Sequence, residues 1–98
     1  QSNHEGGIVD ALQEARTGAS AVIINPAGYG HTSVAILDTI QALAVPVIEV
    51  HLSNLARRET FRHHSYVSRG ATGIIMGLGA QGYLRAIDAI AEILKGSK

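Results

Sequence analysis

Apolar and polar positions along the chain follow two different periods. Three short, mostly apolar runs are typical of strands buried on both faces of a sheet. They are residues 20–25, 46–51 and 72–76. Three longer segments repeat apolar side chains at the spacing of an amphipathic helix. They are residues 6–16, 33–44 and 81–94. Because helices alternate with the later strands, the pattern predicts an α/β fold with a doubly wound parallel sheet.

The same spacing predicts which side of each helix faces the core. The predicted inner faces carry Ile8, Leu12 and Ala15 in the first helix, Ile36, Ile40 and Leu43 in the second, and Leu84, Ile87, Ala91 and Leu94 in the third. Thr32 or Ser33 can cap the second helix, and Gly96 ends the third. Residues 52–71 are polar and basic, and a long segment of this kind is functional or contains short helical turns.

Composition limits the classes of protein to consider. With 98 residues, 46% of them hydrophobic, the chain is expected to form one α/β domain over residues 1–98. Eight Lys and Arg residues balance eight Asp and Glu residues, so no net field favours nucleic acid or an anionic membrane surface. No cysteine, signal peptide or membrane-spanning run of about 20 apolar residues is visible. The lack of cysteine allows a reducing compartment, and we expect a cytoplasmic protein.

Polar side chains follow two of the predicted strands. Asn25 and His31 come after the first strand, and His51, Ser53 and Asn54 come at the end of the second. The carboxyl ends of parallel strands lie at one edge of a sheet, where ligands of open α/β sheets bind. Two histidines, amides and a hydroxyl at this edge predict a site for a small polar substrate.

Two other kinds of site match the sequence less well. Residues 77–82 fit the pattern GxGxxG, but the acidic residue expected about 20 positions later is absent, so a tight turn with close packing is preferred. The chain has five histidines, of which His63 and His64 are adjacent, and no pair has the i, i+4 spacing of a helical zinc site. We therefore expect no metal.

The long polar segment contains four arginines, which either lie in a solvated loop or subunit contact or bind a substrate. A planar guanidinium can fork onto a carboxylate or onto neighbouring hydroxyls. We assign that role to Arg62, and we interpret Arg57, Arg58 and Arg69 as solvated or subunit-contact residues. Tyr29 has no cationic neighbour close in sequence, so we interpret it as a packing residue rather than a general base.

Several motifs, in order along the whole chain, resemble type II 3-dehydroquinate dehydratase. They are Gln1-Ser2-Asn3-His4-Glu5-Gly6, Asn25-Pro26, Gly28, His31-Thr32-Ser33-Val34-Ala35, Glu49-Val50-His51-Leu52-Ser53-Asn54, Arg62-His63-His64-Ser65-Tyr66 and Gly77-Leu78-Gly79-Ala80-Gln81-Gly82-Tyr83. The resemblance implies a flavodoxin-like fold and a homododecamer built of trimers. It also implies dehydration of 3-dehydroquinate to 3-dehydroshikimate through an enolate, in the shikimate or quinate pathway, without metal or cofactor.

The resemblance also implies roles for individual residues. His51 resembles the general acid that protonates the leaving hydroxyl, and Glu49 would orient or tune it. The substrate-binding residues would be Asn25, His31 and Arg62 for hydroxyls, and Leu52 and Ser53 for the carboxylate. Asp38 matches an acidic residue that reaches a neighbouring subunit's site. These roles suit the chemistry, because a β-hydroxy ketone needs a base at the α-carbon and an acid at the departing oxygen.

Some features of the family have no counterpart here. The family's general base is a tyrosine activated by an arginine on an N-terminal lid, and its first strand is central in the sheet. We therefore expect residues 1–98 to be the carboxyl-terminal part of a larger enzyme, with an incomplete sheet and the base in an N-terminal segment. Gly30 and Leu37 stand where the family often has threonine and arginine. The alternatives are a truncated subunit that binds substrate or product without turnover, and a flavodoxin-like nucleotide-binding module.

Overall fold

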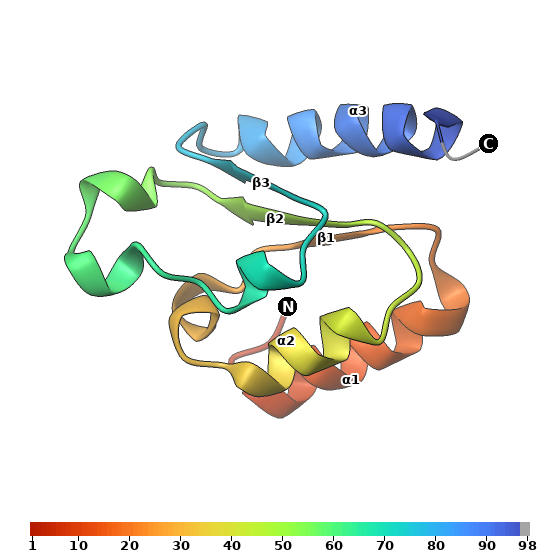
Figure 1. The fold of residues 1–98 in the computed structure, drawn as a ribbon, viewed down its shortest axis with the longest axis horizontal. Helices are drawn as coiled ribbons and strands as arrows, with labels where there is room; N and C mark the ends of the chain where they lie inside the picture. Colours follow the sequence, from red (N-terminus) through yellow and green to blue (C-terminus); the bar gives the residue numbers. More distant parts are fainter. Residues whose placement is uncertain (97–98) are drawn as a thin grey trace.

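Three parallel strands form the sheet of the computed structural model, which describes residues 1–96 (Figure 1). They are β1 (Val22–Ile24), β2 (Val47–His51) and β3 (Gly73–Met76), in the order β1-β2-β3. Every residue of the central strand is buried. The parallel α/β fold predicted from the sequence is confirmed. The first strand is shorter than predicted, because residues 20, 21 and 25 lie outside the ladder.

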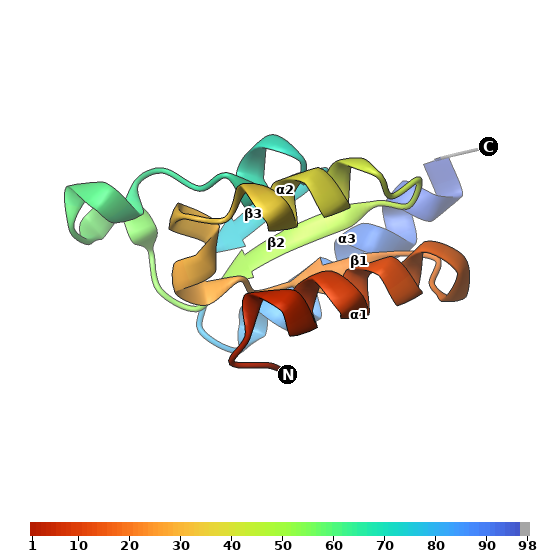
Figure 2. The same cartoon turned by 90° about the horizontal axis from the view of Figure 1, so that it is seen from below.

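Helices cover both faces of the sheet. Helices α1 (Glu5–Gly18) and α2 (Val34–Gln41) lie on one face, and α3 (Gln81–Gly96) lies on the other (Figures 1 and 2). The buried cluster under α1 and α2 is formed by Leu12, Ile24, Ile36, Ile40, Val47 and Val67. The cluster under α3 is formed by Ile48, Val50 and Ala86. Residues of β2 thus alternate between two cores, as the two-residue period of a strand requires.

The predicted inner face of α3 is wrong. Leu84 and Ile87 are 49% and 56% exposed, whereas Gly82 and Ala86 are buried against the sheet. Ala91 and Leu94, the other two residues predicted to face inward, are also exposed. The helix carries apolar side chains around much of its circumference, so its periodicity did not identify the buried side. The face that packs on the sheet also carries Tyr83, Ile90 and Ile93.

The cap of α2 agrees with the sequence, and its carboxyl end does not. The Ser33 hydroxyl accepts a hydrogen bond from the Ile36 amide at 3.0 Å, which satisfies a free amide of the first turn. The helix ends at Gln41 rather than at residue 44, although Leu43 still packs against the core. The predicted core residues Ile36 and Ile40 are both buried.

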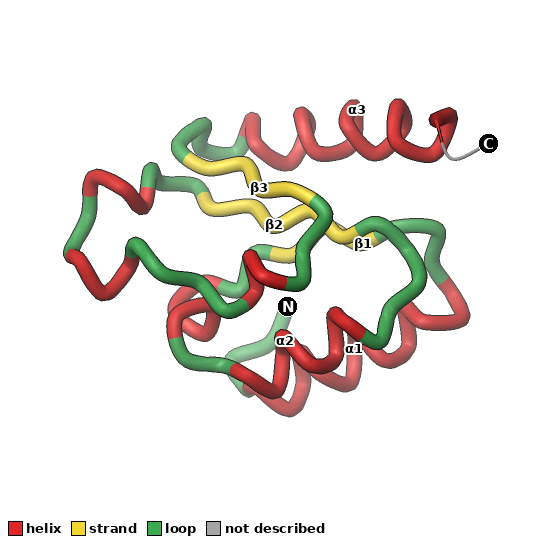
Figure 3. Tube along the Cα trace, viewed as in Figure 1, coloured by secondary structure: helices red, strands yellow, loops and turns green. Residues whose placement is uncertain are grey.

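The long polar segment contains three short helical turns, one of the two possibilities that its length indicated. They are Leu55–Arg57, Thr60–Arg62 and Val67–Arg69. Figure 3 shows the first two on an excursion that projects from the body of the molecule. The fully buried side chain of Val67 anchors the returning chain beneath α2.

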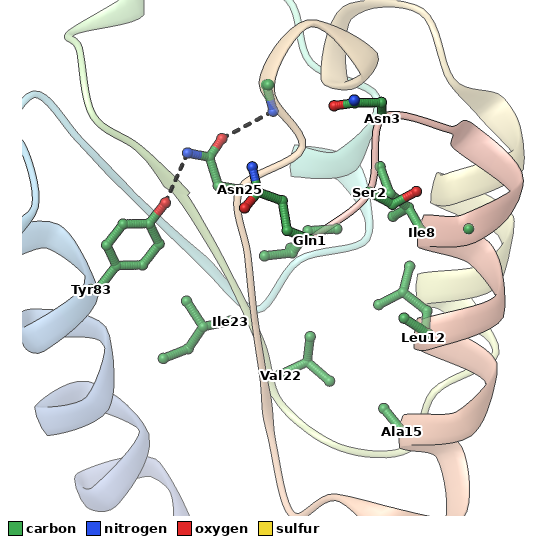
Figure 4. Close-up of a pocket in the computed structure, with 14 residues that line it drawn as sticks. Gln1, Ser2, Asn3, Ile8, Leu12, Ala15, Val22, Ile23, Asn25 and Tyr83 are labelled. Atoms are coloured by element: carbon green, nitrogen blue, oxygen red, sulfur yellow. Dashed lines mark hydrogen bonds between the residues drawn. The ribbon is translucent and has the colours of Figure 1, made fainter.

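β1 lies at one edge of the sheet, and an apolar groove of about 760 Å³ runs beside it. Figure 4 shows the groove between α1 and α3, with Ile8 and Leu12 on one wall and Tyr83 on the other. Within the described residues, no helix combines the length and hydropathy needed to cross a membrane.

Candidate active site

A polar cavity of about 330 Å³ opens beyond the carboxyl ends of β1 and β2. Its lining includes Asn25, Ala27, Gly28, His31, His51, Leu52, Ser53, Leu55, Arg58 and Arg62. Every substrate-binding residue proposed from the sequence is in this lining, as is His51. The parallel sheet brings together the residues that end or follow β1 and β2, because both strands end at the same edge.

His51 is held at the wall of the cavity by Glu49. The two residues are two positions apart on β2, so their side chains leave the same face of the strand. His51 Nε2 lies 2.5 Å from Glu49 Oε2. The Glu49 side chain is fully buried, and that of His51 is 5% exposed. The pairing that the sequence suggested is therefore present as a buried ion-pair geometry.

Two serines complete the surroundings of the Glu49 carboxylate. Ser65 Oγ donates a hydrogen bond to Oε2 at 2.8 Å, and Ser68 Oγ donates one to Oε1 at 2.5 Å. Burial by itself raises the pKa of Glu49. The hydrogen bonds from His51, Ser68 and Ser65, with the charge of His51, outweigh burial and hold the pKa below its ordinary value of 4.5. Glu49 is therefore ionised at neutral pH.

The ionised carboxylate determines which His51 nitrogen faces the cavity. A carboxylate only accepts hydrogen bonds, so Nε2 carries the hydrogen that it shares with Glu49. No fully buried side-chain nitrogen or oxygen among the described residues lacks a partner. Glu49 binds only Nε2 of the ring. Nδ1 is therefore accessible from the cavity that His51 lines. In the imidazolium form, Nδ1 can donate a proton there.

His31 stands opposite His51 at the end of a short helical turn, Ala27–His31. Its Nδ1 lies 2.7 Å from the carbonyl oxygen of His64, and because a carbonyl only accepts, Nδ1 carries a hydrogen. This bond leaves Nε2 to contact a ligand. The rings of His31 and His51 are nearly parallel, with centroids 6.5 Å apart. Both side chains also line the cavity, so one ligand there can contact both imidazoles.

Two arginines, rather than one, reach the cavity. Arg62 donates from Nε to Glu59 Oε2 at 2.6 Å, and its guanidinium lies 5.1 Å from the Phe61 ring centre. Arg58 donates to Ser53 Oγ at 3.4 Å and lines the same cavity. Arg58 is 41% exposed, which agrees with our interpretation of a solvated residue, but it also lies at the cavity, where no role was predicted for it. The short turns of the long segment bring both guanidinium groups back over the strand ends.

Asn25 lies between the polar cavity and the apolar groove and lines both. Its Oδ1 accepts the Ala27 amide at 3.0 Å, and its Nδ2 donates to Tyr83 Oη at 2.9 Å (Figure 4). Both ends of the side-chain amide are thus fixed by the protein, although the residue itself is exposed. This arrangement orients Asn25 before any ligand binds.

Other residues singled out in the sequence lie away from the cavity lining. Asn54 caps a short turn by accepting the Ala56 amide at 3.1 Å. Asp38 is exposed on α2. Tyr29 packs on the core and donates to the Asn3 carbonyl at 2.9 Å, which supports its interpretation as a packing residue. Within residues 1–96, no three His, Asp or Glu side chains come together as a group that could hold a metal.

The glycine-rich turn before α3 is explained by backbone geometry and packing. Gly77 and Gly79 have φ values of +90° and +58°, a conformation that side chains disfavour. A Cβ atom on Gly82 would lie 3.1 Å from Val50 Cγ1. The backbone conformation explains Gly77 and Gly79, and close packing explains Gly82, so none of the three glycines requires a bound nucleotide.

The residues that sequence reasoning missed come from distant segments. Ser65 and Ser68 reach Glu49 from 16 and 19 positions away, and Tyr83 reaches Asn25 from 58 positions away. Ser65 stands inside a motif that carried the resemblance, but no local pattern indicated its partner. The packing of the long segment under α2 brings the two serine hydroxyls to the site, and the docking of α3 brings Tyr83.

A family model of class II dehydroquinases matches residues 1–91. The chain belongs to the class II dehydroquinase family. The 3-dehydroquinate dehydratase of Caulobacter sp. (strain K31) is 61% identical over 94 residues, which are 96% of this chain. That of Caulobacter vibrioides is 58% identical over 95 residues, or 97% of this chain. The crystal structure of the type II dehydroquinase from Butyrivibrio crossotus matches with a TM-score of 0.90 and 45% identity over 93% of this chain.

The class II dehydroquinase relatives are longer than this chain. The chain spans 64% of the Caulobacter sp. protein and 65% of the Caulobacter vibrioides protein. It likewise covers 64% of the Butyrivibrio crossotus chain. About one third of each dehydroquinase therefore has no counterpart in the residues described above.

Proposed function

We propose that this chain carries the binding and proton-donating half of an enzyme that dehydrates 3-dehydroquinate to 3-dehydroshikimate through an enolate. The observation that supports this most is the buried His51–Glu49 pair, with Nε2 and Oε2 2.5 Å apart, at the wall of a polar cavity. Such a pair supplies a positioned proton donor. Such a donor is needed at neutral pH, because hydroxide is a poor leaving group unless it is protonated as it leaves carbon.

His51 acts as the general acid in this proposal. After a proton leaves the α-carbon, the electron pair of the enolate re-forms the carbonyl and expels the β-hydroxyl, which takes a proton from His51 Nδ1 and departs as water. The Glu49 carboxylate stabilises the imidazolium before this step and orients the ring. Glu49 is therefore a positioning residue, whereas His51 touches the departing oxygen.

The remaining lining residues bind the substrate. Asn25, His31 and Arg62 suit hydroxyl groups, because they present an amide, an imidazole nitrogen and a guanidinium to the cavity. Leu52 and Ser53, which follow β2, suit the carboxylate through their backbone amides and the Ser53 hydroxyl. Arg58 beside Ser53 adds positive charge at that end of the cavity.

The general base is proposed to come from an N-terminal segment of the same protein. No tyrosine is among the residues that line the polar cavity, while Tyr83 Oη already accepts a hydrogen bond from Asn25. The relatives' additional third is long enough to bring a tyrosine and an arginine. The open edge of β1 and the adjacent groove of about 760 Å³ offer that segment a place to pack.

Three further parts of the proposal rest on family resemblance. They are a homododecamer of trimers, in which Asp38 contacts a neighbouring subunit, a role in the shikimate pathway or in quinate breakdown, and a cytoplasmic location. Sedimentation of the full-length protein tests the first, and Asp38→Ala is expected to weaken the assembly. An unchanged assembly in this variant would remove Asp38 from the interface.

The function is tested by supplying the absent third. Residues 1–98 are fused behind the N-terminal part of the Caulobacter sp. relative that has no counterpart here, and the conjugated enone product is followed by its absorbance. We expect no measurable turnover by residues 1–98 alone and clear turnover by the fusion. Turnover by the purified, mass-verified 98-residue chain would place the base within it and refute the division of roles.

A second function is binding without turnover, favoured by the lack of a tyrosine in the cavity lining. Calorimetric titration with 3-dehydroshikimate distinguishes it. Binding by a fusion that has no activity supports this alternative, whereas an active fusion rejects it.

A further inference from the structure

Residues 64–68, which we name the strap, bind His31 and Glu49, the residue that pairs with His51. The His64 carbonyl accepts from His31 Nδ1 at 2.7 Å, and the Tyr66 amide donates to the Gly30 carbonyl at 2.7 Å. The strap therefore holds the turn that carries His31. Its Val67 side chain is fully buried in the core, which fixes the strap against the sheet.

The strap also holds the carboxylate behind His51. Ser65 Oγ donates to Glu49 Oε2, the oxygen that faces His51, and Ser68 Oγ donates to the other oxygen, Oε1. A carboxylate bound through one oxygen only can turn about its last side-chain bond. With donors on both oxygens, the plane of the Glu49 carboxylate is fixed, and the direction of Oε2 toward His51 is fixed with it.

We propose that Ser65 and Ser68 are positioning residues for the proton donor: their hydroxyls keep the buried Glu49 carboxylate aimed at His51 Nε2, so that Nδ1 faces the cavity. The kinetic part of this inference rests on the proposed dehydratase function. The structural part does not, because the hydroxyls bind Glu49 whatever ligand the cavity takes.

Other charged or titratable groups near His51 do not replace this arrangement. The His31 ring centre lies 6.5 Å from that of His51, and Arg58 and Arg62 line the cavity from the long segment. Neither arginine has a hydrogen bond to Glu49; Arg62 is paired with Glu59 and Arg58 contacts Ser53. The two serines are therefore the only donors besides His51 that reach the carboxylate among the described residues.

A double-mutant cycle separates positioning from packing. In the active fusion, Ser68→Ala is expected to lower kcat about tenfold, the effect of one lost hydrogen bond to a charged group, with KM changed less than about threefold. In the Glu49→Gln background the same change is expected to cost less than about threefold, because the charge it supports is gone. Ser68→Thr, which keeps the hydroxyl, is expected to restore most of kcat. Ser20→Ala, an exposed serine outside both sites, is the matched control.

Acid unfolding of the same variants gives a readout that does not require activity. Loss of the Ser65 or Ser68 hydroxyl raises the pKa of Glu49, so the wild-type advantage over each alanine variant is expected to shrink as pH falls below about 4.5. Equal losses of kcat in the wild-type and Glu49→Gln backgrounds, or a stability difference independent of pH, would overturn the proposal. An inactive fusion with a pH-dependent difference would leave the serine inference standing and refute the dehydratase function instead.

Discussion

Replacing Glu49 with glutamine removes one negative charge from a fully buried site while keeping the shape of the side chain. The carboxylate accepts three hydrogen bonds, two at Oε2 from His51 and Ser65 and one at Oε1 from Ser68. A glutamine oxygen at the Oε2 position keeps the first two bonds. Its NH₂ group then faces Ser68, whose hydroxyl must rotate to accept.

The expected cost follows from these contacts. The bonds from His51 and Ser65 become bonds to a neutral amide oxygen, and each loses about 1 kcal/mol of stabilisation. Rearrangement at Ser68 costs about 1 kcal/mol more. Burial of a neutral amide instead of a carboxylate offsets part of this sum. We therefore expect the free energy of unfolding at pH 7 to fall by about 1–3 kcal/mol, which moves a urea midpoint by roughly 0.5–2 M.

The pH dependence gives the sign of the effect. Because the folded-state pKa of Glu49 lies below its ordinary value of 4.5, the carboxylate stabilises the fold above pH 4.5. This contribution is lost as pH falls through the folded-state value. Urea unfolding at pH 7 and at pH 3.5 should therefore show a large difference between wild type and Glu49→Gln at the higher pH and a smaller one at the lower pH.

A surface carboxylate is the matched control. Glu59 is 52% exposed and pairs with Arg62, and we expect Glu59→Gln to change stability little at either pH. If Glu49→Gln is as stable as wild type at pH 7, or if its deficit is equal at both values of pH, then the carboxylate is not the ionised, hydrogen-bonded group described above.

Three further predictions concern the site and the packing beneath it. In the active fusion, His51→Gln should lower turnover roughly 10²–10⁴-fold with little change in product binding, and turnover within about threefold of wild type would exclude His51 as the general acid. Arg62→Lys should raise KM because a lysine cannot reproduce the guanidinium fork, whereas the exposed Arg57→Lys should not; equal KM values in both would remove Arg62 from the site. Gly82→Ala should destabilise the fold by about 1 kcal/mol in urea unfolding, since the new Cβ would lie 3.1 Å from the buried Val50, and a stabilised variant would contradict this packing.

The sequence identified most of the cavity because its signals are local. His31, His51 and Ser53 follow short apolar runs, and a parallel sheet brings the ends of such runs to one edge. The Glu49–His51 pair is equally local, since two residues two positions apart share one face of a strand. For these residues, knowing that the segment is a strand already determines the direction of the side chain.

Tertiary structure decided the features that depend on contact between distant segments. Arg58 and Ser68 belong to a segment without regular periodicity, so their direction is set only by how three short turns fold back over the sheet. The orientation of α3 is a different case, because its periodicity is clear but its apolar surface is wide. Gly82 and Ala86 face the strands together with Tyr83, Ile90 and Ile93, so the docking of the helix on the sheet decides which part of this wide apolar surface is covered.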